Sequence, residues 1–212
     1  MNYNIIPSDE NTFEFRSGAD STVEILESAG GSHVDVETDR PVLFRITADG
    51  RHFSIGRIDQ PDLGDFISAV IGFVRNRDAS GLKKFGQERA SVSIRIFTDA
   101  GTLNIKALNS SVLVRKDLDQ LRLKSSNLSL RNEGLIRNLD LKASNGAMEL
   151  NLGRTVSSWQ IKACNSSIRL NANGFDGEIR SSVRGGTGCV RPAGGGKGLV
   201  SITAINGNVT IG

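Results

Sequence analysis

The feature that most constrains this 212-residue chain is an internal repeat in its second half. Similar segments begin 18, 18 and 20 residues apart, at Leu103, Leu121, Leu139 and Trp159. A further copy spans 200–211, and a degenerate one can be aligned between 170 and 200 through Ile179, Ser181, Val183 and Val190. A period of about 20 residues predicts an architecture in which each unit packs against its neighbours.

Each unit reads as two short strands joined by a bend. Apolar residues alternate with polar ones at Leu103, Ile105 and Ala107, and again at Val112 and Val114, which is the period of a strand. Asn-Ser or Asn-Gly lies between the two strands and tolerates the left-handed backbone of a tight bend. One such pair cannot bury its apolar face alone, so the units must stack.

We therefore predict an all-β fold, a β-solenoid similar to a parallel β-helix, with coils of about 20 residues over 91–212. Stacking should produce one interior row from Leu103, Leu121, Leu139 and Trp159, and a second from Ile105, Leu123, Leu141, Ile161 and Ile202. The bend asparagines should stack as an amide ladder formed by Asn109, Asn127, Asn145, Asn165 and Asn206. Antiparallel hairpins in a sandwich are the alternative, but recurrence of the same residue types at matching positions favours parallel stacking.

The first 90 residues are less regular. Residues 1–60 predict a β region that could hold early coils, with 44–55 resembling the later repeat. Residues 61–90 predict a short capping helix near 62–76 and a connecting loop. A peripheral membrane anchor is the alternative for this helix, but Asp62 and Asp65 occupy its polar face, where such an anchor carries Lys or Arg. No apolar run is long enough to predict a transmembrane segment.

Charge is distributed unevenly. Residues 1–90 carry 10 Lys and Arg against 15 Asp and Glu, whereas 91–212 carry 16 against 8. Cations recur at one outward position of successive units, namely Lys106, Lys124, Lys142, Lys162 and, in the degenerate copy, Arg180. Such a row could bind an anionic polymer or surface, or it could be a solvated face that protects the sheet from aggregation.

Base-specific recognition of nucleic acid is not expected, because the aromatic residues of 91–212 are only Phe97, Trp159 and Phe175. Trp159 also falls on a predicted interior row.

The sequence offers little material for catalysis. Its only cysteines and histidines are Cys164, Cys189, His33 and His52, and their spacing matches no metal site, disulfide framework or catalytic motif. The glycine-rich run over 184–198 lacks the P-loop pattern. Asp140 and Glu149 are the only acidic residues of the middle coil, which is weak support for a carbohydrate-active enzyme. We expect no catalytic residues, no cofactor and no bound metal.

At its bends the chain resembles a bacterial β-solenoid repeat family known as "putative adhesins", a domain family of unknown function. Members carry a short strand, a Ser/Asn-Gly bend and a second short strand about every 20 residues. The matching bends are 107–110, 143–146, 163–166 and 204–207. The resemblance covers roughly 91–212, and weakly 20–55. It implies the solenoid fold and a bacterial source, and it implies no particular activity.

The leading hypothesis is a non-enzymatic structural or interaction protein. The chain ends in the strand of its last copy, so we expect the coil containing Val200 and Ile211 to be an open end. Because an open end exposes unpaired backbone groups and apolar surface, we also expect a homo-oligomer. Binding of an anionic polymer through the lysine row is the alternative, and a carbohydrate-active enzyme is a third. No secretory signal is visible at the N-terminus, which predicts a cytoplasmic protein.

Overall fold

A computed structural model describes residues 1–4, 10–16, 20–39, 41, 44–49, 52–57, 91–192 and 194–212. These residues form seventeen strands of one hydrogen-bonded sheet, and none of the described residues belongs to an α-helix. The capping helix predicted near 62–76 lies outside the described residues. No helix that could span a bilayer occurs in the described part of the chain.

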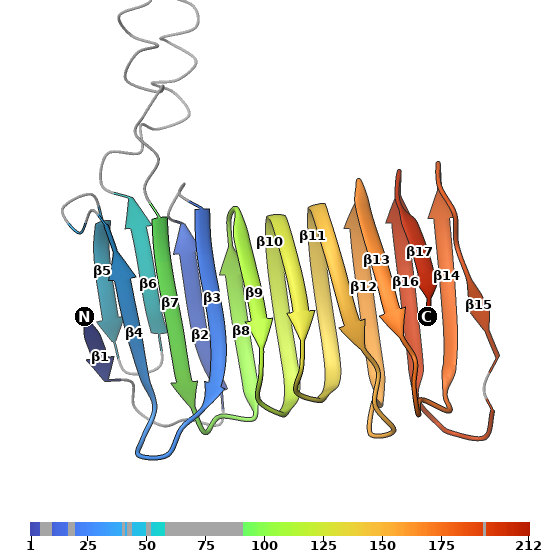
Figure 1. The fold of residues 1–212 in the computed structure, drawn as a ribbon, viewed down its shortest axis with the longest axis horizontal. Coiled ribbons are helices and arrows are strands. Elements are labelled where there is room, and N and C mark those ends of the chain that lie inside the picture. The colour runs from blue at the N-terminus through green and yellow to red at the C-terminus, as the bar shows by residue number, and fades with distance from the viewer. Residues whose placement is uncertain are drawn as a thin grey trace, which may run out of the picture.

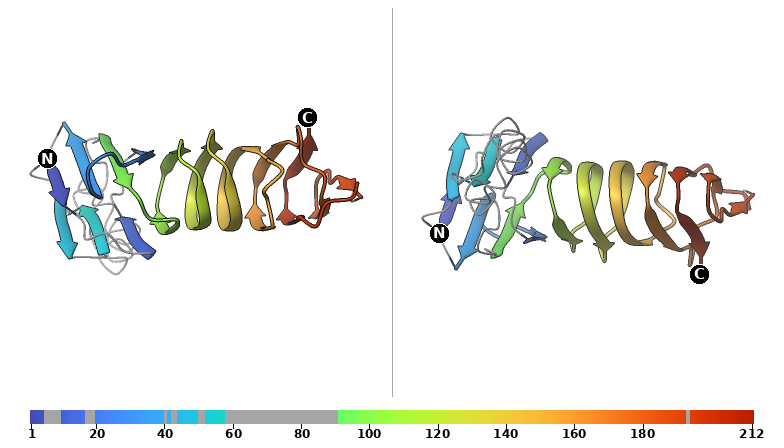
Figure 2. Two further views of the ribbon diagram at one scale, coloured as in Figure 1. Left: turned by 90° about the horizontal axis from the view of Figure 1, so that it is seen from below. Right: turned by 90° about the horizontal axis from the view of Figure 1, so that it is seen from above.

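The strands form two rows that run along one elongated stack (Figures 1 and 2). The first row contains, in spatial order, β5 (Phe44–Asp49), β6 (His52–Arg57), β2 (Glu10–Arg16), β8 (Thr102–Ala107), the first halves of β10 (Leu118–Asn132) and β11 (Ile136–Asn151), β12 (Ser158–Cys164), β16 (Leu199–Ile205), β14 (Glu178–Arg184) and β15 (Val190–Arg191). The second row contains β1 (Asn2–Asn4), β4 (His33–Thr38), β7 (Ser91–Thr98), β3 (Asp20–Glu27), β9 (Ser110–Val114), the second halves of β10 and β11, β13 (Ser166–Asn171) and β17 (Asn208–Ile211).

The repeat units pair parallel and in register. Leu121 pairs with Leu103 on one side and with Leu139 on the other, and Leu139 pairs in turn with Trp159. The second predicted row occurs as well, from Ile105 to Ile202, and every member of both rows is almost completely buried. Because all strand pairings from β8 to β13 are parallel, the alternative of antiparallel hairpins is wrong for these units.

The bend needs a local change in the strand alternation. In β10, Leu123 and Ser125 face the interior, two outward residues follow, and Leu128 and Leu130 then face the interior again. This shift lets one continuous strand pass from the first row to the second. At the other type of bend a left-handed asparagine breaks the strand, with φ of 51° at Asn109 and 47° at Asn165.

Residues 44–55 were predicted to resemble a unit of the later repeat, and the structure differs from this prediction. That segment is the antiparallel hairpin β5–β6 and not a coil, because Asp49 pairs directly with His52. The strands that continue the parallel register are β2 and β3, which pair with β8 and β9 respectively. Phe13 of β2 packs against Phe53 of β6 with ring centroids 6.4 Å apart.

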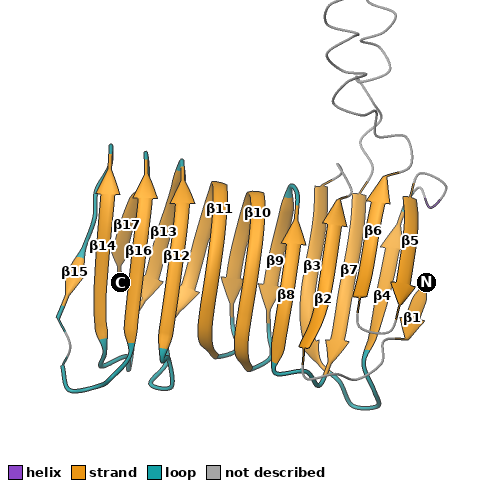
Figure 3. Ribbon diagram, turned by 180° about the vertical axis from the view of Figure 1, so that it is seen from behind, coloured by secondary structure: helices purple, strands orange, loops and turns teal. Residues whose placement is uncertain are grey.

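The predicted open end is wrong for the strand of Val200 but not for that of Ile211, because β17 is the last strand of the second row and meets only the isolated bridge of Thr187 with Asn208 beyond it in the described chain. β16 lies between β12 and β14, and β15 follows β14, so the strand that holds Val200 is two strands in from the end of the first row (Figure 3). The degenerate copy lies outside it, with Ile179 against Val200 and Ser181 against Ile202. β15 then folds back antiparallel on β14. Val190 therefore lies outside the parallel register and is 70% exposed.

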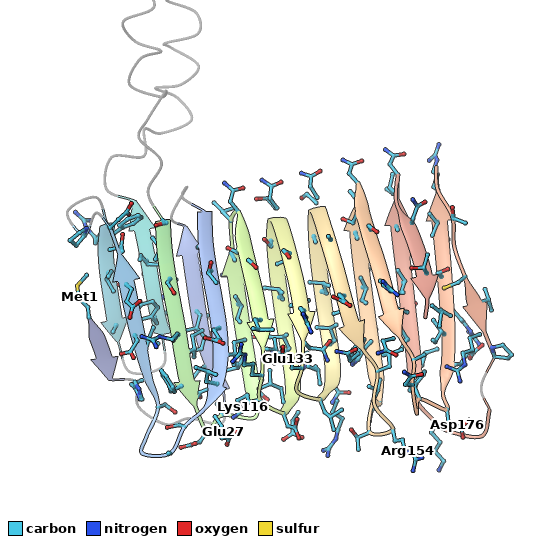
Figure 4. The ribbon with its side chains drawn as sticks, viewed as in Figure 1. Met1, Glu27, Lys116, Glu133, Arg154 and Asp176 are labelled. Atoms are coloured by element: carbon cyan, nitrogen blue, oxygen red, sulfur yellow. The ribbon has the colours of Figure 1, made fainter. Side chains whose placement is uncertain are left out.

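Buried polar residues stabilise the turns on the second row. Asn151 donates its backbone N–H to Asn132 Oδ1 at 2.9 Å, and Asn171 donates from Nδ2 to Asn151 Oδ1 at 3.1 Å. Nearby, the buried ammonium of Lys116 donates to the carbonyls of Thr98 and Ala100 at 2.7 and 3.2 Å. Figure 4 shows Lys116 close to Glu27 at the edge of the stack, and their charged groups are 3.5 Å apart.

Asn11 is the contrasting case and yields a prediction about stability. It is fully buried in register with Leu103, and its side-chain amide has no hydrogen-bond partner among the described residues. Asn11→Leu should raise the free energy of unfolding by about 1–3 kcal/mol, because an unsatisfied buried amide is replaced by an apolar side chain of similar size. Urea unfolding of the intact chain measures this change.

The matched control is Asn132→Leu, which removes an amide that is hydrogen-bonded on several sides. This variant should lower the free energy of unfolding by roughly the same amount. A loss of stability in Asn11→Leu would show that the Asn11 amide is satisfied in solution.

Candidate functional site

Four of the predicted cations form one line on the outer surface of the first row of strands, and we call this line the lysine row. Lys106 of β8 pairs with Lys124 of β10, which pairs with Lys142 of β11, which pairs with Lys162 of β12. All four side chains are exposed. Because neighbouring strands are roughly 4.8 Å apart, these ammonium groups project from adjacent positions along the long axis of the stack.

Arg180 is not part of this row. It pairs with Ser201, which pairs with Gln160, so Arg180 continues the neighbouring outward position. The lysine position is occupied by Thr203 on β16 and by Ser182 on β14. The sequence prediction aligned Ile179 of the degenerate copy with Ile105. In the structure Ile179 occupies the position of Leu103, so the predicted alignment was shifted by two residues. Arg180 instead forms an ion pair with Glu178 at 2.6 Å, which raises the pKa of its guanidinium.

Among the described residues, an ion pair neutralises the lysine row at one end. Lys106 forms an ion pair with Glu14, its register partner on β2, at 2.5 Å. Lys124, Lys142 and Lys162 have no ion pair within the described part of the chain. Several other surface arginines do have carboxylate partners, in the pairs Arg95–Glu37, Arg115–Glu24 and Arg137–Asp119.

The three lysines line a shallow groove that follows the row. Its remaining surface comes from Thr203, which occupies the lysine position of β16, and from residues between the row and the asparagine bend, which are Ser125, Ala143, Ser144, Ala163, Cys164 and Ile205. A second groove lies on the other side of the row and is lined in part by Asn104, Arg122 and Asp140. The lysine face is therefore hollowed on both sides of the row.

The opposite face carries a different pattern. Its corresponding outward position alternates in sign, from Arg131 through Glu149 to Arg169, and ends at Thr210. The Asp140 side chain is on the lysine face and Glu149 is on the opposite one, so these carboxylates cannot act together as a catalytic pair. The excess of positive charge belongs to the lysine face.

The asparagines form a ladder at the bend that borders the groove. Asn127 donates from Nδ2 to Asn109 Oδ1, Asn145 to Asn127 at 2.9 Å, and Asn165 to Asn145 at 3.1 Å. Asn206 has the same left-handed backbone, with φ of 52°. The ladder fixes the edge of the groove.

The other candidate residues have structural surroundings. The His33 ring stacks on Phe97 with centroids 4.5 Å apart, and its Nδ1 is 3.0 Å from the Gly31 carbonyl. The glycine-rich run packs closely at the end of the stack, because a Cβ on Gly186 would lie 1.7 Å from the Gly207 carbonyl oxygen. No group of three or more His, Cys, Asp or Glu that could hold a metal ion occurs in the described ranges.

Two features of the structure were not predicted from the sequence. The first is Glu14, which neutralises Lys106 across 92 residues of chain, and no local pattern predicts such a distant pairing. The second is the inner amide ladder of Asn132, Asn151 and Asn171, which does have a signal. Each of these asparagines ends a second strand after an apolar-polar alternation.

The two thiols should differ in reactivity. Cys164 is exposed, whereas burial raises the pKa of the Cys189 thiol. Because the thiolate is the reactive form, Cys189 should be alkylated more slowly than Cys164 near pH 8, and its rate should rise at higher pH. Rates with N-ethylmaleimide in Cys164→Ser and Cys189→Ser chains measure each thiol alone. Equal rates across pH 7–9 would contradict this prediction.

No family model and no curated protein matches the chain. Among solved structures, it is similar to a "putative cell adhesion protein" from Clostridium sporogenes, with a TM-score of 0.48, 8% identity, and coverage of 100% of this chain and 97% of that one. A "putative adhesin" from Bacteroides fragilis has a TM-score of 0.39, 10% identity and coverage of 100% and 94%. A "putative lipid binding protein" from Parabacteroides distasonis has a TM-score of 0.35, 12% identity and coverage of 100% and 95%. At such identities and TM-scores, these likenesses place the chain in no family and identify no ligand.

Proposed function

We propose that this chain is a non-enzymatic interaction protein, that its repeat units form a β-solenoid, and that it binds an extended anionic polymer along Lys124, Lys142 and Lys162. The parallel in-register pairing of β8 to β13 and the sharp bends between the two rows support the solenoid. The lysine row supports the polymer, because it presents charges in a line parallel to the stack.

The observation that carries this proposal is the absence of an ion-pair partner for these three lysines within the described residues. Like charges directly opposite one another on neighbouring strands destabilise a sheet. At Lys106 the fold offsets such repulsion with Glu14. A polyanion lying along the row would supply the missing negative charge and would release counterions when it binds.

A solvated face that prevents aggregation explains the row less well. Lysines that serve this purpose are placed on edge strands, where unpaired backbone groups could recruit another chain. Lys124, Lys142 and Lys162 are instead on β10, β11 and β12, each of which has strand neighbours on both sides. Their position favours a ligand on the face of the sheet.

Self-association through the coil of Val200 and Ile211 has less support. The outer edge of β16 is paired with β14 along its whole length. On the second row, β17 meets Thr187 in an isolated bridge with Asn208. The lysine face is therefore the surface on which we place the interaction.

The double variant Lys124→Glu and Lys142→Glu tests this proposal. Its affinity for fluorescein-labelled dextran sulfate and for linear polyphosphate should fall roughly tenfold or more at 0.15 M salt, because two of the phosphate or sulfate contacts are lost. The slope of log affinity against log salt should decrease in parallel. Fluorescence anisotropy measures both quantities.

The matched control is Arg131→Glu with Arg169→Glu, which changes the net charge by the same amount on the opposite face. This control should retain most of the affinity for both polymers. Equal losses in the two double variants would show that only the overall charge matters, and the proposal would then be wrong. Unmodified dextran should not bind to any of these chains.

A further inference from the structure

The groove beside the lysine row has two chemically different walls. One wall is formed by the ammonium groups and aliphatic stems of Lys124, Lys142 and Lys162. The outward residues on the other side are Ser144, Cys164 and Ile205, and the almost completely buried Ser125, Ala143 and Ala163 lie between the two sides. A ligand that lies in this groove meets positive charge on one side and, at Cys164 and Ile205, apolar surface on the other.

Ile205 is one of five large apolar residues that are exposed among the described residues. It is 46% exposed, whereas the apolar residues of the interior rows are almost completely buried. It occupies the outward position next to the bend, in register with Cys164. An isoleucine at this exposed position gives a ligand an apolar contact surface. A Ser or Thr side chain would present a hydroxyl there, and a Lys side chain would present a charge.

We infer that the polymer held by the lysine row is an acidic polysaccharide, whose sulfate or carboxylate groups meet the lysines while the apolar faces of its sugar rings lie against Cys164 and Ile205. This inference rests on the proposed function. A pyranose ring carries its charged substituents at the edge and presents C–H groups on its faces, so a chain of such rings matches both walls.

The groove is a poorer match for other polyanions. Single-stranded nucleic acid is held largely by stacking of bases on aromatic side chains, and no aromatic residue lines either groove beside the row in the described part of the chain. Linear polyphosphate carries negative charge on all sides and has no apolar face, so Ile205 would add nothing to its binding.

The test compares two exposed apolar residues of β16. Ile205 lines the groove, whereas Leu199, at the other end of the strand, is 38% exposed and does not line it. Ile205→Ser should weaken binding of dextran sulfate about fivefold, because apolar contact area is lost, and should leave binding of polyphosphate unchanged. Leu199→Ser should change neither.

Each other outcome overturns the inference. An unchanged affinity of Ile205→Ser for dextran sulfate would show that the apolar wall is not used, and an equal loss for polyphosphate would show a general effect. Tighter binding of poly(U) RNA than of dextran sulfate to the unaltered chain would indicate a nucleic acid. In all three cases, loss of binding in the Lys124→Glu and Lys142→Glu double variant would still uphold the proposed function.

A second measurement needs no substitution at Ile205. Dextran sulfate bound in the groove should slow alkylation of Cys164 by N-ethylmaleimide several-fold in the unaltered chain, because Cys164 lines the groove. Cys189, which does not line it, should react at the same rate with and without the polymer. Unchanged reactivity of Cys164 at saturating dextran sulfate would place the ligand elsewhere.

Discussion

The rest of this structure depends on parallel strand pairing in strict register. When residue i of one unit pairs with its equivalent in the next, every position of the repeat becomes a row along the stack. Leucines of successive units then pack against one another and exclude water. Side-chain amides can likewise donate hydrogen bonds to the same amide of the neighbouring unit, as in the ladder from Asn109 to Asn165. The same constraint forces Lys124, Lys142 and Lys162 into one line. The pairing that stabilises the interior therefore concentrates charge on the exterior.

The asparagine ladders show how the register is held. Because side chains alternate across a strand, a slip of one residue would move every buried group to the surface. At each end of the repeat an amide contacts its counterpart in the next unit, outside at Asn145 and inside at Asn151. Lys116 serves a similar purpose between two turns, because its ammonium donates to the backbone carbonyls of Thr98 and Ala100, 18 and 16 residues earlier in the chain. Polar groups at the bends thus specify the register that the apolar rows stabilise.

Sequence alone predicted the regular part of the fold well and its ends poorly. Between Leu103 and Leu170 the repeats are local, so period, bend and interior rows could be read from neighbouring residues. Arg180 was misplaced because the degenerate copy has few apolar residues, and two alignments fit it almost equally. Glu14 could not be assigned to Lys106 because that contact depends on long-range topology. The shared register position of the four lysines was therefore predicted from sequence, whereas the ion pair at one end of their row was not.

The two ends of the stack share a topology that bears on where a partner can bind. At the C-terminal end, β16 is inserted between β12 and the earlier strand β14. At the N-terminal end, β2 is inserted between β8 and the later strand β6. In both cases strands from elsewhere in the sequence cover the first or last parallel strand, and antiparallel partners β5 and β15 follow. On the first row, such covering reduces the unpaired backbone that would otherwise favour end-to-end association, whereas on the second row β17 meets only the isolated bridge of Thr187 with Asn208 among the described residues. The long lateral faces remain, and we propose the ligand for the face on which Lys124, Lys142 and Lys162 have no ion pair with any described residue.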